Sequence, residues 1–178
     1  MIAAIVLAAG AASRFGAPKQ RLLLPGVLER VRRSSVDGIV VVAGAYALDA
    51  EGAEVVECPD WKRGPGASLR CGLAALPRAA EAVIVCLADG PSLEPQAIDR
   101  VISAWHAGAG PLLAASYGGE RGHPVLLARG LWGAIPDEGA RALEPVLVPC
   151  DDLGSPGDVD RADDLVEPGR SQRPAAES

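Results

Sequence analysis

The sequence predicts a three-layer α/β/α domain in which helices cover both faces of a mostly parallel sheet. Short apolar runs rich in β-branched residues, such as those at 2–7 and 82–87, have the length and composition of strands that are buried on both faces. These runs alternate with segments of helical periodicity that are about 10 to 15 residues long. Because open parallel sheets bind ligands at the carboxyl ends of their strands, a functional site is expected in the loops that follow these runs.

The individual elements follow from the apolar runs and from the residues that begin or end helices. Pro25 and Gly26 interrupt the chain after the first loop, so the first helix is expected only at 27–34. Ser92 is a suitable N-cap for a helix at 92–107, and Gly108 would end it. A further helix, between these two in the chain, is expected at 68–76. Strands are expected at 2–7, 39–43, 53–57, 82–87, 111–116, the apolar residues after Pro124, and 146–148.

Composition points to one domain with a short tail. The 178 residues are 49% hydrophobic and only 3% aromatic, so Ala, Val and Leu must fill the core of a domain expected at 1–166. Residues 167–178 are polar without periodicity and are expected to be disordered. A net charge of −6 without a basic stripe argues against nucleic acid as a partner. The apolar start is too short for a membrane span and lacks a basic n-region, so a soluble cytoplasmic protein is expected.

The cysteines carry no metal-site or disulfide signature. Cys58, Cys71, Cys86 and Cys150 include no CxxC pair, and only two histidines could join them as ligands. We therefore expect no zinc site and four buried free thiols in a reducing compartment.

The loop after the first strand, LAAGAASRFGAPK at 7–19, is the first candidate binding site. Ala8, Ala9 and Gly10 leave backbone N–H groups open to a ligand, and Arg14 and Lys19 add two positive charges, which is an arrangement suited to phosphate. Arginine outnumbers lysine 15 to 2 in this chain, so a lysine here stands out from the composition. The glycines of the loop are spaced neither as in a P-loop nor as in a dinucleotide fingerprint.

A lone acid follows the strand at 82–87. Asp89 lies in the sequence LADGP, which is also good turn chemistry, so taken alone it serves a turn as well as a site. A cationic loop after one strand and a carboxylate after another together describe the two sides of a metal–triphosphate site.

Four blocks of the chain, in the same order, resemble the MobA-like nucleotidyltransferases, the group that includes molybdenum cofactor cytidylyltransferase. These blocks are LAAGxxxRxGxxK at 7–19, the W…G…SLRxGLAAL segment up to residue 76, LADxP at 87–91 and GxxGHPVL at 119–126. DEGAR at 137–141 and DVDRADDL at 158–165 resemble two further elements of the family. The resemblance implies a Rossmann-like nucleotidyltransferase fold and covers nearly all of residues 1–166.

The resemblance also implies roles for single residues. Six residues of the first loop would hold the nucleotide: Leu7, Ala8, Ala9, Gly10, Arg14 and Lys19. Ser68 would reach the base or ribose of that nucleotide. Asp89 and Asp160 would bind Mg²⁺. His123 and Arg141 would face the acceptor. Three of the residues outside the loop, like Asp89, also have a structural alternative: Ser68 as a helix cap, His123 as a turn residue, and Asp160 as the cap of a last helix.

The departures from the family pattern are specific. The segment after Lys19 is shorter than usual, Gly90 stands where a Gln or Met is common, and Arg161 and Ala162 replace the usual Thr and Pro. These changes keep open the alternative of a catalytically weak nucleotide-binding platform.

The expected reaction is transfer of a nucleotidyl group from a nucleoside triphosphate to a phosphorylated small molecule. The loop sequence LAAG, with Ala9, resembles that of the cytidylyl-transferring branch of the family, whereas the guanylyl-transferring branch tends to have Gly at this position. CTP is therefore the favoured donor, and molybdenum cofactor is the favoured acceptor. With that acceptor, a molybdoenzyme or a maturation protein is the expected protein partner. A methylerythritol-phosphate or sugar-phosphate nucleotidyltransferase is the alternative within the same chemistry.

Overall fold

A seven-stranded sheet forms the centre of the computed structural model, which describes residues 1–11 and 19–157. The strand order is β3-β2-β1-β4-β6-β5-β7. The strands are β1 (Ile2–Leu7), β2 (Gly38–Ala43), β3 (Glu54–Glu57), β4 (Ala82–Leu87), β5 (Leu112–Tyr117), β6 (Glu120–Ala128) and β7 (Val146–Pro149).

The sheet is parallel except at β6, which runs antiparallel to both of its neighbours, β4 and β5. A tight turn joins β5 to β6, and Gly118 and Gly119 occupy it with φ of 62° and 80°. These positive φ values are characteristic of two-residue hairpin turns. The expected mostly parallel α/β sheet is therefore confirmed, with one hairpin inserted into it.

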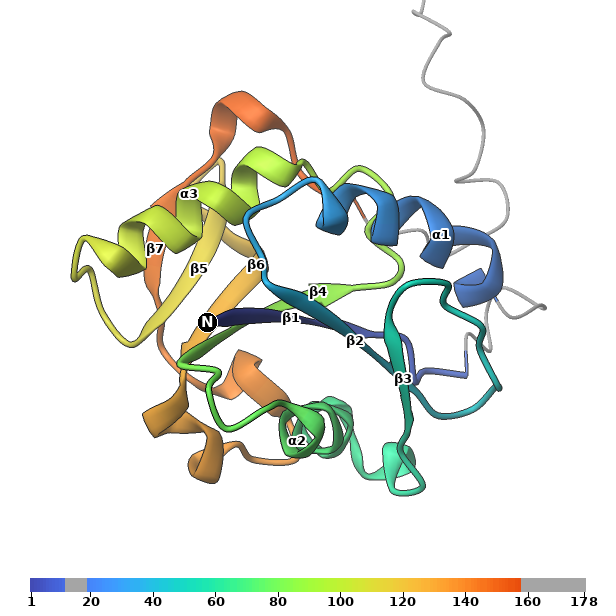
Figure 1. Ribbon diagram of the computed structural model, residues 1–178. Helices are drawn as coiled ribbons and strands as arrows, with labels where there is room; N and C mark the ends of the chain where they lie inside the picture. The colour runs from blue at the N-terminus through green and yellow to red at the C-terminus, as the bar shows by residue number, and fades with distance from the viewer. Residues whose placement is uncertain (12–18, 158–178) are drawn as a thin grey trace, which may run out of the picture.

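Helices cover both faces of the sheet, as Figure 1 shows. Helices α1 (Lys19–Arg32) and α3 (Pro95–His106) lie on one face, and α2 (Pro65–Ala75) lies on the other. The core consequently has two parts: Val6 and Ile84 pack beneath α1 and α3, whereas Ile5 and Val83 pack beneath α2. Alternate residues of one strand thus enter different halves of the core.

Short 3-10 helices complete the layer on the α2 side. They are η1 (Trp61–Arg63), η2 (Arg129–Ala134) and η3 (Gly139–Ala142), while η4 (Asp151–Leu153) follows β7. Leu131, Trp132 and Ala140 pack against the same half of the core as α2. The segment between β6 and β7 therefore lies on the face of the sheet that α2 covers.

The first helix is longer than the sequence predicts. It begins at Lys19 instead of residue 27 and continues through Pro25. Because proline has no backbone N–H, the carbonyl of Arg21 lacks its helical hydrogen-bond donor at Pro25. Both residues lie on the exposed side of the helix. Leu24, Val27 and Leu28 are fully buried on the opposite side, so apolar burial outweighs the local cost of the proline.

The other two helices also begin at different residues than expected. Helix α3 starts at Pro95 with Glu94 as its N-cap, because the backbone N–H of Ser92 donates to the carbonyl of Pro156 (2.9 Å) and Ser92 belongs to the preceding turn. Helix α2 starts at Pro65, so Ser68 lies inside its first turn and is not a cap. In both helices proline occupies the first position, which suits its fixed φ.

The expectation of four free thiols is wrong for one pair. Cys58, just after β3, forms a disulfide with Cys71 of α2, whose Cα lies 5.8 Å away. The chain between them, residues 59–70, turns back through η1, which brings the two side chains together although their separation of 13 positions carries no signature. Cys86 and Cys150 are free and buried, as expected.

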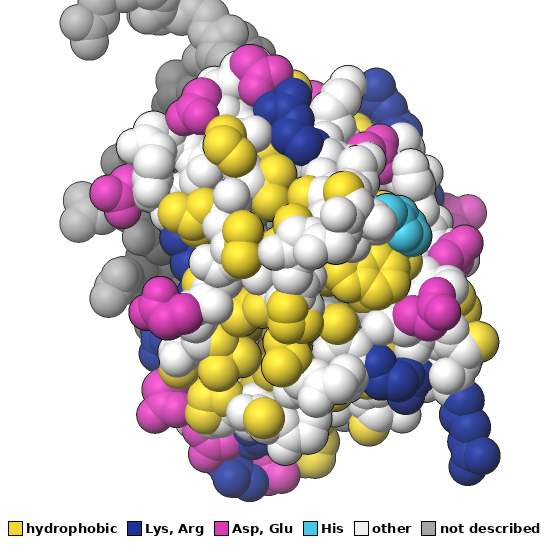
Figure 2. Space-filling model, turned by 90° about the vertical axis from the view of Figure 1, so that its left-hand side faces the viewer, with side chains coloured by type: hydrophobic (Ala, Val, Ile, Leu, Met, Phe, Trp, Pro, Cys, Tyr) yellow, Lys and Arg dark blue, Asp and Glu magenta, His cyan; other side chains and the backbone are white. Residues whose placement is uncertain are grey.

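One side of the molecule shows hydrophobic side chains interspersed with charged ones (Figure 2). This is the side on which β7 and the end of α3 lie in Figure 1, and β7 leaves Val146 and Leu147 exposed at the sheet edge. Within the described ranges, no helix is long and apolar enough to cross a membrane.

Candidate functional site

The candidate site lies where the chain changes direction across the sheet. After β1 the chain adds β2 and β3 on one side and returns as β4 on the other, so that Leu7 and Leu87 pair as the last residues of adjacent strands. The N–H of Ala88 donates to the carbonyl of Leu7 (3.1 Å), and the N–H of Ala8 donates to that of Val42 (2.9 Å). Such a switch point leaves a crevice at the carboxyl ends of the strands, where α/β proteins bind ligands.

A cavity of about 350 Å³, here called the β1 cavity, opens at this point. The loop residues Leu7 to Gly10, Asp89 and Ser68 of α2 line it, and their roles in binding stay predictions. The sequence analysis named no site role for the rest of the wall: Gln20, Trp61, Lys62, Gly64, Pro65, Leu87 and Ala88. A signal did exist, since Lys62 is the second of only two lysines in the chain and lies in the same family-like block as Ser68.

Lys19 and Asp89 meet beside this cavity. The Nζ of Lys19 lies 3.0 Å from the Oδ2 of Asp89, with 7% of the lysine side chain and 32% of the aspartate side chain exposed. The first residue of α1 thus reaches the turn after β4, so the predicted cationic and anionic sides of the site are adjacent. A largely buried ammonium group requires a partner of opposite charge, and Asp89 supplies one.

The side chain of Gln20 in α1 holds the start of the loop that follows β1. Its Nε2 donates to the carbonyl of Gly10 (2.8 Å), and its side chain is almost completely buried. On the other side, the N–H of Ala45 donates to the carbonyl of Ala9 (3.0 Å), and the hydroxyl of Tyr46 donates to that of Ala11 (3.0 Å). Three carbonyl groups of the described part of the loop are thereby bound, those of Ala9, Gly10 and Ala11. The N–H of Ala8 is used within the sheet edge, so Ala9 and Gly10 are the residues whose N–H groups could serve a ligand.

Trp61 packs closely on this loop. A Cβ atom at Gly44 would lie 2.7 Å from both the carbonyl oxygen of Ala9 and the Cγ of Trp61, so only glycine permits this approach. The ammonium of Lys62 lies 5.7 Å from the centre of the Trp61 ring. An indole and an ammonium group therefore belong to the same cavity wall as Ala9.

A second cavity of about 330 Å³, here called the β6 cavity, adjoins the first and shares Leu7, Pro65 and Leu87 with it. His123 and Arg141, the two predicted acceptor residues, both line it. Arg121 lines it as well and was missed from the sequence. Arg121 also faces a third cavity of about 350 Å³ on the far side of His123, where residues 155–157 form part of the wall.

The histidine in this wall is neutral. Burial and the nearby positive charge of Arg121 together lower the pKa of His123 to about 4, against a smaller opposing effect of Asp89. The hydroxyl of Tyr117 donates to the backbone carbonyl of His123 (2.9 Å) and holds this strand segment in place. At neutral pH the imidazole therefore offers one donor and one acceptor, and the positive charge of the β6 cavity comes from the arginines.

A divalent cation fits the chemistry of Asp89. The described residues contain no group of three or more acidic, histidine or cysteine side chains that could enclose a metal ion by themselves. Mg²⁺ does not need such a cage, because it typically uses one or two carboxylates together with water and substrate phosphates. Asp89 supplies one carboxylate in the wall of the β1 cavity. Arg14 and Asp160 lie outside the described residues, so their roles stay predictions.

Comparison with known proteins identifies the family. The model of the MobA-like NTP transferase domain matches residues 4–147. The chain belongs to this family. The nucleotidyltransferase fold and the family predicted from the sequence are confirmed. The match includes all the residues that line the β1 and β6 cavities, whereas residues 155–157 of the third cavity lie beyond it.

Individual relatives of this MobA-like domain are distant. The bifunctional enzyme IspD/IspF of Nitratidesulfovibrio vulgaris is 33% identical over 128 residues, which cover 58% of this chain and 32% of that enzyme. The chain thus spans about a third of the length of the curated relatives it matches.

Solved structures extend the similarity over most of the chain. The structure of Rv0371c from Mycobacterium tuberculosis H37Rv is 28% identical with a TM-score of 0.76 and covers 92% of this chain and 94% of that one. A manganese complex of Rv0371C is 25% identical with a TM-score of 0.67 and covers 84% and 88%. The 2-C-methyl-D-erythritol 4-phosphate cytidylyltransferase of Francisella tularensis is 14% identical with a TM-score of 0.67, covers 92% and 96%, and shows the fold alone.

Proposed function

We propose that this protein transfers a cytidylyl group from CTP to a phosphorylated small molecule, with Mg²⁺ as the metal and molybdenum cofactor as the acceptor. The observation that carries the proposal is the contact between Lys19 and Asp89 at the edge of a loop-lined cavity, next to a second cavity with arginines in its wall. The first cavity suits a nucleoside triphosphate, and the second suits an anionic acceptor.

In the proposed reaction, an oxygen of the acceptor phosphate attacks the α-phosphorus of CTP. The bond from the α-phosphorus to the oxygen that bridges to the β-phosphorus breaks, and pyrophosphate leaves with that electron pair. An acceptor phosphate is already ionised at neutral pH, so no general base is required, and the neutral His123 is consistent with this. Catalysis then depends on positioning and on charge stabilisation.

The residues of the β1 cavity provide both. The backbone N–H groups of Ala9 and Gly10 would bind the phosphates, and Lys19 and the predicted Arg14 would offset their negative charge. Asp89, with the predicted Asp160, would hold Mg²⁺, which when bound neutralises charge on the phosphate oxygens. A divalent metal in this family is supported by the manganese complex of Rv0371C.

Preference for CTP is supported by the crowding around Ala9. A Cβ atom at Gly44 would lie 2.8 Å from the Ala9 methyl carbon and 2.7 Å from the Cγ of Trp61, so both residues pack close to Gly44 where they line the cavity. A pyrimidine needs less room there than a purine. Ser68, buried in the first turn of α2, lines the same wall and is the proposed polar contact to the base or ribose.

A second acceptor, methylerythritol phosphate, is favoured by one specific observation. The relative that is 33% identical carries the IspD name in its description. Both acceptors present a phosphate to the same site and yield pyrophosphate, so the proposed roles of Lys19 and Asp89 are identical for either.

The test is release of pyrophosphate with Mg²⁺, one nucleoside triphosphate at a time, against molybdenum cofactor and against methylerythritol phosphate. The proposal predicts release only with CTP and molybdenum cofactor. Release with methylerythritol phosphate alone would replace the acceptor. Nucleotide binding without release from either acceptor would instead identify a nucleotide-binding platform.

A further inference from the structure

Residues 135–143 connect the walls of the two cavities, and we propose that Asp137 is a positioning residue that fixes these walls relative to each other. The inference rests on the proposed function, because it concerns how donor and acceptor are aligned. Asp137 lines neither the β1 cavity nor the β6 cavity, so any effect it has on binding acts through other residues.

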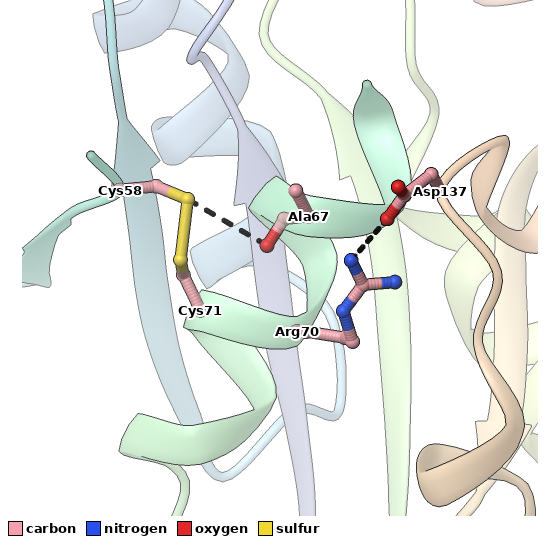
Figure 3. The surroundings of a disulfide bond; sticks show 5 residues. All are labelled: Cys58, Ala67, Arg70, Cys71 and Asp137. Atoms are coloured by element: carbon pink, nitrogen blue, oxygen red, sulfur yellow. Dashed lines mark hydrogen bonds and ion pairs between the residues drawn. A yellow bond between two sulfur atoms is a disulfide. The ribbon is translucent and has the colours of Figure 1, made fainter. Parts of the chain in front are cut away.

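The carboxylate of Asp137 joins two elements of the β1 cavity. Arg63, the last residue of η1, donates to it at 3.2 Å, and Arg70 of α2 forms a closer ion pair with it. Figure 3 shows Arg70 extending from α2 toward Asp137, on the opposite side of the helix from the disulfide. Because η1 carries Trp61 and α2 carries Ser68, one carboxylate orients two parts of the same wall.

The backbone around Asp137 makes a second connection. The N–H of Gly66 donates to the carbonyl of Asp137 (2.9 Å), and the Nη1 of Arg70 donates to the carbonyl of Ile135 (2.7 Å). A Cβ atom at Gly66 would lie 1.7 Å from the carbonyl oxygen of Pro136. The chain at 136–137 therefore lies directly on the first turn of α2.

The chain then continues into the wall of the β6 cavity. Gly139 and Arg141 of η3 line this cavity, only a few residues after Asp137. Arg121 holds η3 from the other side by donating to the carbonyls of Ala140 (2.9 Å) and Leu143 (2.7 Å). Asp137 is thus the point where the segment fixed by Arg121 meets the elements of the β1 cavity.

The charge of Asp137 is well suited to this role. Its hydrogen bonds with Arg70 and Arg63 lower the pKa of its carboxyl group, so the group stays ionised well below neutral pH. Charge-assisted hydrogen bonds to guanidinium groups are directional as well as strong, so they define orientation in addition to proximity. Asp137→Asn keeps the size of the side chain and removes its charge.

The experiment compares Asp137→Asn with Asp152→Asn. Asp152 forms a similar exposed pair with Arg100 beyond β7 and lines neither cavity, so it is a matched control. We expect Asp137→Asn to raise KM for both CTP and acceptor roughly tenfold, which corresponds to weakening one charge-assisted hydrogen bond. Asp152→Asn should leave both KM values unchanged, while thermal stability falls by a similar small amount in the two variants.

Hydrogen exchange supplies a readout that does not require turnover. In Asp137→Asn the amides of 61–68 and 139–142 should exchange faster than in the native protein, and in Asp152→Asn they should not. Unchanged exchange in both segments, or KM values equal to those of Asp152→Asn, would overturn the inference. If the native protein itself releases no pyrophosphate, the proposed function fails, and exchange alone decides the role of Asp137.

Discussion

The ammonium of Lys19 lies 3.0 Å from the carboxylate of Asp89, although 70 residues separate them in the chain. Lys19 is the first residue of α1 and Asp89 follows β4, so this contact exists only because β1 and β4 are neighbours in the sheet. It places a cation beside the carboxylate that would hold a metal. In the proposed function, Asp89 would face both Lys19 and the metal, so the charge of each residue would affect the other.

Asp89→Asn is expected to weaken the response to the metal. The amide keeps one oxygen but loses the negative charge that a hard divalent cation prefers. We predict that half-maximal activity requires at least about tenfold more Mg²⁺, measured as pyrophosphate release over a Mg²⁺ titration. Asp99→Asn, on the outer surface of α3, is the control and should leave the titration unchanged. An identical Mg²⁺ dependence in Asp89→Asn would remove Asp89 from the metal site.

Glycine substitutions test the contact between α2 and residues 136–137. Gly66→Ala would place a Cβ atom 1.7 Å from the carbonyl oxygen of Pro136, so it should destabilise the protein by at least about 1 to 3 kcal/mol. Gly26→Ala, inside α1 with no atom within 4 Å of the new Cβ, should stabilise it by about 0.5 to 1 kcal/mol. Denaturant unfolding measures both. Equal effects of the two substitutions would contradict the described packing.

The disulfide predicts a definite count of thiols. In protein denatured and alkylated without reductant, two cysteines should be labelled, namely Cys86 and Cys150. Mass spectrometry gives the count, and labelling of Cys58 and Cys71 would contradict the pairing. Replacing both paired cysteines with serine should lower the free energy of unfolding by about 2 to 4 kcal/mol, because the open chain gains entropy when unfolded.

The low pKa of His123 predicts a loss of stability in mild acid. Its pKa is about 4 in the folded protein and 6.5 in the unfolded chain, so below pH 6.5 the unfolded state binds a proton that the folded state does not. Between pH 6.5 and 4 this lowers the free energy of unfolding by up to about 3 kcal/mol. His123→Gln should remove that part of the pH dependence. If the variant and the native protein show parallel stability curves over this range, the histidine is not held neutral.

Much of the site could be predicted from sequence because its parts follow strands directly. Ala8, Ala9 and Gly10 come after one buried apolar run and Asp89 after another, so a parallel sheet brings them to the same edge. His123 and Arg141 were assigned to the acceptor by resemblance to a family, and both line the β6 cavity. The apolar runs were sufficient to place residues 8–10 and Asp89 at one edge of the sheet, whereas His123 and Arg141 required the family resemblance, and the roles of all these residues stay predictions.

The remaining features depend on packing that local patterns do not show. The start of α1 was missed because a proline such as Pro25 usually interrupts a helix. The helix continues through Pro25 because Leu24 and Val27 are buried on the side of the helix that faces the core. Arg121 was missed because its role depends on carbonyl groups about twenty residues later in the chain. The pairing of Cys58 with Cys71 likewise depends on how η1 turns between β3 and α2.

The fate of the α-phosphate of CTP tests the proposed nucleotidyl transfer most directly. With α-labelled CTP, Mg²⁺ and molybdenum cofactor, the native protein should transfer the label to the acceptor. Lys19→Ala should transfer it roughly 100- to 1,000-fold more slowly while keeping a native circular dichroism spectrum, because one charge that stabilises the transition state is lost. Label transfer by Lys19→Ala at the native rate would show that the contact between Lys19 and Asp89 does not belong to a nucleotidyl-transfer site.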